Sequence, residues 1–290
     1  MSAVELEQIS LRGIDLNLAA DVAGPADAPT LLFLHGSGQT RQSWSGALTE
    51  AIQRGYRAVS LDLRGHGDSE WSPDGEYSLD KFAADIRHVI EQLDDEPIVV
   101  GASLGGLIGM MIAAAPPPRL RALVLVDITA RVEMSGANEV VAFMDSAPDG
   151  FASVEEAAAA VAAYLPHRPR PTNTNGLKRN LRLRNGRYYW HWDPAFMRMG
   201  RDSQGKLRSS GPNPLETFAR AINIPTLLVR GSRSRIVSEA GAREFLEMVP
   251  HAEFVDIAGA HHMVAGDAND AFNGAVFDFI DRQVGQHAGT

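Results

Sequence analysis

The stretch Ile98-Val99-Val100-Gly101-Ala102-Ser103-Leu104-Gly105-Gly106 decides the fold of this chain. A short apolar run at 98–100 leads directly into the pattern Gly-x-Ser-x-Gly, which is followed by a nearly all-apolar or small stretch at 104–115. This order predicts a buried strand, a sharp turn with Ser103 at its tip, and a helix. Neighbouring backbone passes close to such a turn, so small residues are needed on both sides of the serine, and the flanking glycines supply them.

Short apolar runs rich in β-branched residues recur along the rest of the chain. The predicted strands are residues 6–11, 14–20, 30–34, 58–61, 98–100, 120–126, 226–229 and 253–257. Helical patterns lie between them, at 79–93, 104–115, 239–248 and 271–282. The later strands lack alternation, as strands buried on both faces do. This order predicts an α/β fold with a mostly parallel eight-stranded sheet, helices on both faces and an antiparallel start around a turn at Gly13.

The segment from about residue 131 to residue 221 breaks this alternation, because it contains no strong buried strand. Helical patterns are expected there at 138–146, 154–165 and 176–183. A structureless connector of that length would be unusual in a compact domain. We therefore expect residues 131–221 to form a helical cap, or lid, inserted after the sixth strand, with a long connector as the alternative. Residues 1–130 and 222–290 would form the core domain.

Composition limits the possible functions. The 290 residues include no cysteine, which excludes disulfides, thiolate metal sites and a cysteine nucleophile. The formal net charge of −9 argues against general nucleic-acid binding, because phosphates would be repelled. No run approaches the roughly 18 apolar residues of a membrane span. Residues 1–10 also lack the basic and apolar pattern of a signal peptide, so a cytoplasmic protein without membrane association is expected.

A second glycine-rich turn follows the predicted strand at 30–34 and reads His-Gly-Ser-Gly over residues 35–38. At the carboxyl end of a parallel strand, such a turn exposes backbone N–H groups where the active sites of these sheets form. The N–H of Ser37 and the N–H of Leu104, at the start of the helix after Ser103, would together bind a developing oxyanion. Gly38 is the alternative donor.

Four motifs in this order resemble the α/β-hydrolase family over nearly the whole chain. They are the turn at 35–38, Asp62-Leu63-Arg64-Gly65-His66-Gly67-Asp68-Ser69, the turn at Ser103, and Gly259-Ala260-His261-His262-Met263. The resemblance implies the α/β-hydrolase fold, and a hydrolase with Ser103 as nucleophile and no metal or organic cofactor. It also implies a structural turn at 62–69, so His66 is not assigned to catalysis. A serine here argues against epoxide hydrolases and haloalkane dehalogenases, in which this family places an aspartate.

A serine hydroxyl is a poor nucleophile until a base takes its proton. In this fold the base is a histidine that follows the acid late in the chain, and the turn at 259–263 offers two. Similar sequences usually read Gly-small-Gly-His at this point, which aligns His262 with the catalytic position. His261 then stands where a small residue is common. His262 is the predicted base, and His261 remains the alternative.

The acid is missing from the place that the resemblance implies. In many members it follows the seventh strand, but residues 231–237 contain no carboxylate, and Arg235 stands where an aspartate is expected. An arginine cannot stabilise an imidazolium, so the acid must come from elsewhere or the protein is catalytically impaired. Asp127, directly after the sixth predicted strand, is the predicted acid, in a placement that resembles fungal zearalenone lactonases and some dehalogenases. Asp256, within a strand, is the less well placed alternative.

Together these residues predict a serine hydrolase that cleaves carboxylic esters or lactones through an acyl-serine intermediate. Its partner would be a small-molecule substrate, and the protein would be a monomer or homodimer. Aromatic and methionine side chains of the lid would line an apolar pocket or pack the lid onto the sheet. The residues expected to contact substrate are His35, Gly36, Trp190, Trp192 and Met263.

Several alternatives stay open. A carbon–carbon bond hydrolase or a cofactor-free perhydrolase would use the same residues on the same fold. A ligand-binding protein without catalytic activity is a third possibility, because no carboxylate follows Gly231. The basic stretch at 167–187 is either a solvated face or a surface that attracts anionic substrates.

Overall fold

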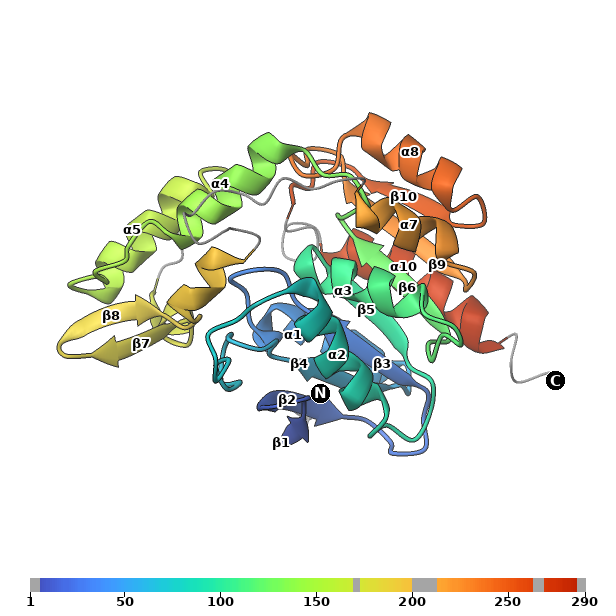
Figure 1. Cartoon of the computed structure of the whole chain (residues 1–290), viewed down its shortest axis with the longest axis horizontal. Helices are drawn as coiled ribbons and strands as arrows, with labels where there is room; N and C mark the ends of the chain where they lie inside the picture. The colour runs from blue at the N-terminus through green and yellow to red at the C-terminus, as the bar shows by residue number, and fades with distance from the viewer. Residues whose placement is uncertain (1–5, 169–172, 200–212, 263–268, 286–290) are drawn as a thin grey trace.

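The computed structural model describes residues 6–168, 173–199, 213–262 and 269–285, which surround a single large sheet (Figure 1). Eight strands lie in the order β1-β2-β4-β3-β5-β6-β9-β10. They are β1 (Glu7–Arg12), β2 (Asn17–Ala23), β3 (Thr30–Leu34), β4 (Arg57–Leu61), β5 (Ile98–Ala102), β6 (Ala122–Val126), β9 (Thr226–Gly231) and β10 (Glu253–Ile257). β2 pairs antiparallel with β1 and β4, and the other neighbours are parallel. The predicted mostly parallel sheet with an antiparallel start is confirmed.

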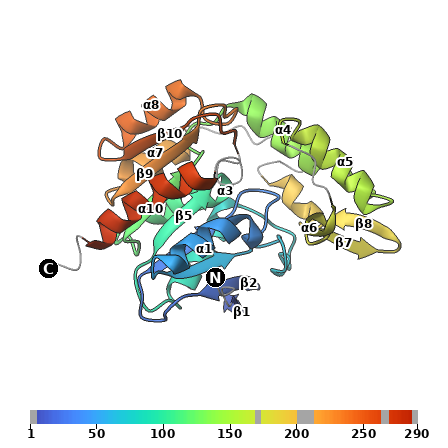
Figure 2. The same ribbon diagram turned by 180° about the vertical axis from the view of Figure 1, so that it is seen from behind.

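Helices cover both faces of the sheet (Figures 1 and 2). The face toward the viewer in Figure 1 carries α2 (Leu79–Ile90), α3 (Leu104–Ala113), α7 (Pro214–Ala221) and α8 (Glu239–Met248). The opposite face, seen in Figure 2, carries α1 (Ser45–Gln53), which follows the short 3-10 helix η1 (Arg41–Trp44), and α10 (Asn269–Gly285). Among the described helices, none combines the length and the apolar character needed to cross a bilayer.

The central strands are buried on both faces, which explains their continuous apolar sequence. In β3 all five residues are buried. Leu31 and Phe33 pack into the core shared with α1 and α10, whereas Leu32 and Leu34 pack into the core shared with α2 and α3. Successive side chains of a strand point to opposite faces, so one short run fills two separate cores.

The helices begin where the sequence offers a capping side chain. The hydroxyls of Ser78, Ser153 and Ser238 accept a hydrogen bond from a backbone N–H of the first turn of α2, of α5 (Val154–Tyr164) and of α8. Such caps satisfy donors that have no acceptor within the helix. α8 occupies the predicted residues, and α2 ends three residues before the predicted boundary at residue 93.

The elements between β6 and β9 extend to one side of the sheet, on the left in Figure 1. They are α4 (Met134–Met144), α5 (Val154–Tyr164), α6 (Asn175–Lys178), β7 (Leu181–Arg184), β8 (Arg187–Trp190) and the 3-10 helix η2 (Pro194–Arg198). α5 matches the helix predicted at 154–165 to within one residue, whereas α4 begins four residues before the helix predicted at 138–146 and ends two residues before the end of that helix. α7 also lies between β6 and β9 in sequence, but it packs against α3 and α8 on the face of the sheet.

The helix predicted at 176–183 is wrong. α6 covers only Asn175–Lys178, and β7 then pairs with β8 in an antiparallel hairpin. Asn185 and Gly186 connect the two strands with φ values of 50° and 79°, as a two-residue turn of type I′ requires. The sequence carries this signal, because an Asn-Gly pair separates two strand-like runs. Leucine alternates with arginine in the first run, at 181–184, and the second run, at 187–190, is rich in aromatic residues.

The turn at 62–69 is held by ion pairs to the buried Arg41 guanidinium. Arg41 binds the carboxylates of Asp21, Asp62 and Asp68, and the Asp62 side chain is fully buried. The Ser69 hydroxyl donates to the backbone oxygen of Asp62 at 2.6 Å. A Cβ at Gly67 would overlap the Asp62 carboxylate, so this turn needs a glycine. These contacts support the structural role that the resemblance implies for the turn.

Candidate active site

Ser103 lies on the turn between β5 and α3, in a strained backbone conformation with φ of 48° and ψ of −114°. A non-glycine residue is uncommon in this region and persists only where its surroundings enforce it. The Ser103 N–H donates to the Val126 carbonyl of β6 at 3.2 Å. A Cβ at Gly101 would overlap the Gly105 carbonyl, and a Cβ at Gly105 would overlap the Leu34 carbonyl. The flanking glycines therefore allow the close packing that presents the serine.

The turn at 35–38 lies beside Ser103. A Cβ added at Gly36 would stand 3.1 Å from the Ser103 Cβ, which shows how near the two loops are. Gln39 holds the turn, because its side-chain oxygen accepts from the Gly36 N–H at 2.9 Å. The Ser37 N–H donates to no acceptor in the described part of the chain. Leu104 opens α3, so its N–H has no acceptor within the helix. Both N–H groups can serve an anion.

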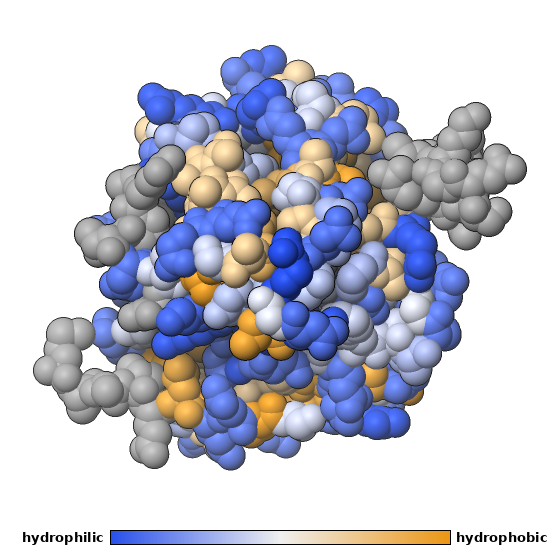
Figure 3. Space-filling model, turned by 90° about the vertical axis from the view of Figure 1, so that its left-hand side faces the viewer, coloured by the Kyte–Doolittle hydropathy of each residue, from blue (hydrophilic) through white to orange (hydrophobic). Residues whose placement is uncertain are grey.

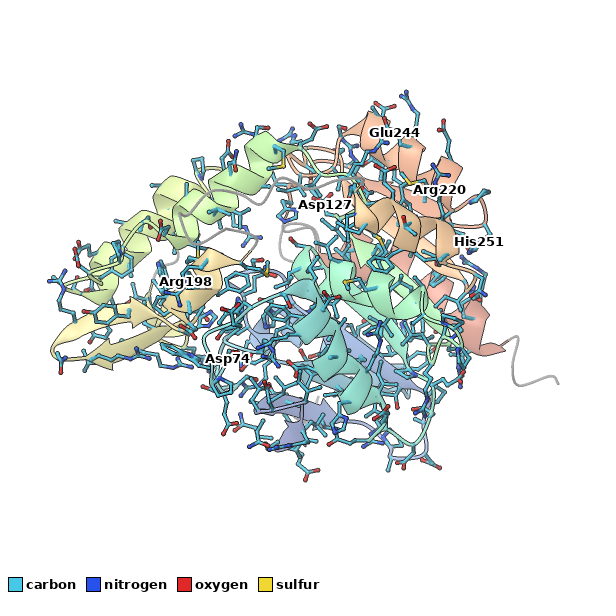
Figure 4. The ribbon with its side chains drawn as sticks, viewed as in Figure 1. Asp74, Asp127, Arg198, Arg220, Glu244 and His251 are labelled. Carbon is cyan, nitrogen blue, oxygen red and sulfur yellow. The ribbon has the colours of Figure 1, made fainter. Side chains whose placement is uncertain are left out.

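Asp127 and His262 meet at the carboxyl end of the sheet, with 2.6 Å between Asp127 Oδ2 and His262 Nδ1. Asp127 follows β6 directly, is fully buried, and lies close to the place where α4 leaves the core (Figure 4). With the Nδ1 hydrogen directed to the carboxylate, Nε2 of His262 is the nitrogen left to accept a proton.

Two groups from the β9 side hold the Asp127 carboxylate in place. The Gly231 N–H donates to Oδ1 at 3.0 Å, and the Ser234 hydroxyl donates to Oδ2 at 2.5 Å. The backbone of Asp127 is held as well, because its N–H donates to the Val229 carbonyl at 2.7 Å, with φ at 50°. These hydrogen bonds fix the position of the carboxylate that faces His262.

The remaining candidates lie elsewhere. The His261 ring stacks on His167 with ring centroids 3.7 Å apart. Asp256 accepts from the Arg230 guanidinium at 3.0 Å. Arg235 is exposed and pairs with Glu139 at 2.6 Å. Met263, one of the expected substrate contacts, lies outside the described residues.

A cavity of about 350 Å³ contains Ser103 and His262 in its wall. The turn at 36–38 forms another part of the wall, and residues between β6 and β9 line the cavity as well. Phe143 and Tyr164 stack there with ring centroids 4.2 Å apart, and Trp190 and Trp192 stack at 5.1 Å. All four rings line the cavity, which is large enough for a small organic molecule and mostly apolar on this side.

His35 supports the turn from beneath and is not among the residues that line the cavity. It is completely buried, its Nδ1 donates to the Gly36 carbonyl at 2.8 Å, and its Nε2 accepts from the Leu63 N–H at 3.0 Å. Gly36, Trp190 and Trp192, the other described candidates for substrate contact, do line the cavity.

Sequence reasoning missed a cluster of three buried histidines beneath the turn at 35–38. The ring centroids of His35 and His66 are 5.3 Å apart, and those of His66 and His191 are 5.9 Å apart. Burial lowers the pKa of His35 to about 4 and that of His66 to about 3, and it lowers the pKa of His191 well below its usual value. All three rings are therefore neutral near pH 7.

His191 connects the turn at 35–38 to two other parts of the molecule. Its Nδ1 accepts from the Gly67 N–H at 2.7 Å, and its Nε2 donates to the Gly38 carbonyl at 3.3 Å. No short-range sequence signal links residues so far apart. Within the described residues, no group of three or more His, Cys, Asp or Glu side chains is arranged to hold a metal ion.

Comparisons with known proteins agree with this architecture. The family model described as alpha/beta hydrolase fold matches residues 29–268. Esterase Rv0045c of Mycobacterium tuberculosis is 31% identical over 248 residues, which cover 83% of this chain and 78% of that protein. The 3-hydroxybutyrate-oligomer hydrolase of Cupriavidus necator is 26% identical over 246 residues, or 82% of this chain and 84% of that protein. The crystal structure of E-2-(acetamidomethylene)succinate hydrolase superposes with a TM-score of 0.83 at 25% identity, covering 96% of this chain and all of the other.

Proposed function

The chain belongs to the alpha/beta hydrolase fold family, and on this premise we propose that it is a serine hydrolase that cleaves carboxylic esters or lactones. Its relatives include several hydrolases, and the one with 31% identity is named an esterase. The observation that carries the proposal is the pair of Asp127 and His262, joined at 2.6 Å, with His262 in the wall of the cavity that also contains Ser103.

In the proposed reaction, Nε2 of His262 takes the proton of the Ser103 hydroxyl as its oxygen attacks the substrate carbonyl. Asp127 keeps the imidazole in the required tautomer and stabilises the imidazolium that forms. The alcohol leaves with a proton from His262, and an acyl-serine remains. Water, activated by the same histidine, then releases the acid and restores the serine.

The N–H groups of Ser37 and Leu104 would bind the oxyanion of each tetrahedral intermediate. Donors fixed by a turn and a helix N-terminus need no rearrangement when the negative charge develops, which is why such sites contribute strongly to rate. The position of Gly36 next to Ser103 supports this role, since it brings the turn to the reacting oxygen.

We also propose that the elements from α4 to η2 form a lid over the cavity. They supply the aromatic side chains above Ser103, among them Phe143, Tyr164 and Trp190. α7, which falls inside the expected range 131–221, packs on the core, so the proposed lid ends before Pro214. An apolar lid fits an ester or lactone with a hydrophobic part, and it excludes bulk water from the reacting groups.

The test combines covalent labelling with a substrate panel. A fluorophosphonate probe should label the purified protein at Ser103, and the Ser103→Ala variant should stay unlabelled. The panel contains p-nitrophenyl esters, lactones and dienoic diketones, the last as substrates for carbon–carbon bond hydrolysis. Hydrolysis of esters or lactones that depends on Ser103 supports the proposal. An unlabelled wild-type protein that hydrolyses none of them would favour a ligand-binding protein without catalysis.

A further inference from the structure

Positive charge is concentrated in one segment of an acidic protein. The chain has a formal net charge of −9, yet residues 167–187 contain no aspartate or glutamate. Their cationic residues are Arg168, Arg170, Lys178, Arg179, Arg182, Arg184 and Arg187. This segment belongs to the proposed lid. Figure 3 views the molecule from the lid side, where hydrophilic side chains cover much of the surface around smaller apolar patches.

Three of these cations have structural contacts outside the cavity. Arg182 donates to Asp68 at 2.7 Å and to the Gly67 carbonyl at 2.6 Å, which ties the hairpin to the turn at 62–69. Arg187 donates to the carbonyls of residues 149 and 150 at 2.8 and 2.7 Å. The guanidinium of Arg184 lies over the Trp71 ring, 4.6 Å from its centre. None of these three lines the cavity at Ser103.

Arg168 is different because it lines the cavity. Among the described residues of the cavity wall, it alone carries a permanent charge, and the wall contains no aspartate or glutamate. An anion inside the cavity would therefore meet no like charge from this wall. Asn180, whose amide can donate further hydrogen bonds, lines the same cavity. Aromatic rings line the same cavity, and attraction between a guanidinium and an anion is stronger in an apolar cavity than in water.

We propose that Arg168 binds a carboxylate of the substrate, so that the preferred substrates are esters or lactones that carry a free carboxylate away from the reacting carbonyl. This inference rests on the proposed function and names the substrate class of the same site. A guanidinium matches a carboxylate with two parallel hydrogen bonds, which fixes the orientation of the ligand as well as binding it. The carboxylate would bind at the lid while the carbonyl lies against Ser103. The basic segment would also attract such anions toward the cavity.

The experiment compares two p-nitrophenyl esters of similar length, the hexanoate and the monoester of adipate, which ends in a carboxylate. The measured quantity is selectivity, defined as kcat/KM for the adipate ester divided by kcat/KM for the hexanoate. Wild-type protein should prefer the adipate ester. Arg168→Gln should lower the selectivity about 10- to 100-fold, chiefly through KM for the adipate ester, which is the usual range for a lost hydrogen bond to a charged group. Arg168→Lys keeps the positive charge but cannot form two parallel hydrogen bonds with a carboxylate, so it should recover part of the lost selectivity.

Arg184→Gln is the matched control, because it removes the same charge from the same segment outside the cavity. Its selectivity should stay near that of wild type, whereas an equal loss in both variants would overturn the proposal in favour of long-range attraction alone. Unchanged selectivity in Arg168→Gln, or a wild-type preference for hexanoate, would overturn it as well. A thermal melt of each variant checks that it is folded.

A separate measurement distinguishes this inference from the proposed function. Adipate binding to the Ser103→Ala protein can be followed by calorimetry, which requires no catalysis. Binding that is lost in Ser103→Ala/Arg168→Gln supports the carboxylate site even if no ester is hydrolysed. Absence of adipate binding overturns the site, while fluorophosphonate labelling of Ser103 and hydrolysis of the neutral ester would leave the proposed function standing.

Discussion

The Ser234 hydroxyl donates a 2.5 Å hydrogen bond to Asp127 Oδ2, the same oxygen that lies 2.6 Å from His262 Nδ1. Ser234 belongs to the turn after β9, where a carboxylate was expected and Arg235 was found. This turn contributes a hydroxyl and the Gly231 N–H, and both hold a carboxylate that comes from the end of the neighbouring strand. The proposed acid, Asp127, therefore follows β6 and not β9, and it contacts the histidine that is the proposed base.

Ser234→Ala should lower kcat about 10-fold and the free energy of unfolding by about 1–3 kcal/mol. The hydroxyl fixes Asp127, and it also accepts from the N–H groups of Ile236 and Val237, each at 3.1 Å. Steady-state kinetics on a p-nitrophenyl ester and urea denaturation measure the two effects. Ser238→Ala is the control, because it removes the cap of α8 at a similar cost in stability without touching Asp127. Equal kcat values in the two variants would contradict the role of Ser234.

Asp127→Asn should lower kcat by about 10⁴, the effect of removing the acid from such a triad. An amide cannot stabilise the imidazolium and can hold the histidine in the wrong tautomer. Adding Arg235→Asp should not restore activity, because the side chain at 235 is exposed and directed to Glu139. Asp256→Asn should leave kcat near its original value. Near-full activity of Asp127→Asn on a p-nitrophenyl ester would disprove the assignment of the acid.

The two adjacent histidines, His261 and His262, should differ sharply in how much their replacement lowers kcat. His262→Ala should lower kcat by about 10⁴ to 10⁶, because Ser103 would lose its base. His261→Ala should change kcat only a few-fold, since its ring stacks on His167 and not against Asp127. Single-turnover acylation by a p-nitrophenyl ester measures the step in which the base acts. If the losses were reversed, the base would be His261 and the Asp127–His262 contact would be structural.

Much of the core could be predicted because its signals are local. The run at 98–106 contains the strand, the turn and the start of the helix in adjacent residues, and the structure places β5 and α3 there. The hairpin at 181–190 was missed even though its Asn-Gly turn is also local. A helix was predicted over residues 176–183 instead, but only its first three residues are helical, because α6 ends at Lys178. α1 and α7 were also not predicted.

The candidate site was predictable only in part. The order of motifs in the family resemblance pointed to Ser103 and His262, and Asp127 was proposed because residues 231–237 contain no carboxylate. The contact at 2.6 Å between Asp127 and His262 joins residues 135 positions apart. Ser234 could not be identified from the sequence, because its role depends on the parallel pairing of β6 and β9. The same holds for the buried histidines, since His191 is 124 residues from the backbone N–H that it accepts from. Such contacts arise from tertiary packing, which local patterns do not encode.

The buried histidines should make the protein sensitive to acid well above the pH at which carboxylates titrate. In the unfolded chain a histidine has a pKa near 6.5, whereas burial lowers the pKa of His35 to about 4 and that of His66 to about 3 in the fold. Below about pH 6.5 the unfolded chain therefore binds protons that the folded chain does not. Stability is unaffected by these groups above that pH and falls as the pH decreases toward the folded pKa values, by about 1.4 kcal/mol per pH unit for each histidine.

His66 offers the sharpest test of this prediction, because its Nε2 is buried and has no hydrogen-bond partner among the described residues. Protonating Nε2 would place an uncompensated N–H in an apolar site beside Phe196, whose ring centroid is 4.9 Å away. His66→Phe should reduce the slope of the unfolding free energy against pH between about pH 6.5 and 4.5. The reduction should be about 1.4 kcal/mol per pH unit, which is the contribution of one histidine. Urea denaturation at several pH values measures this slope. A slope in His66→Phe equal to that of the unaltered protein would mean that His66 takes up its proton without unfolding.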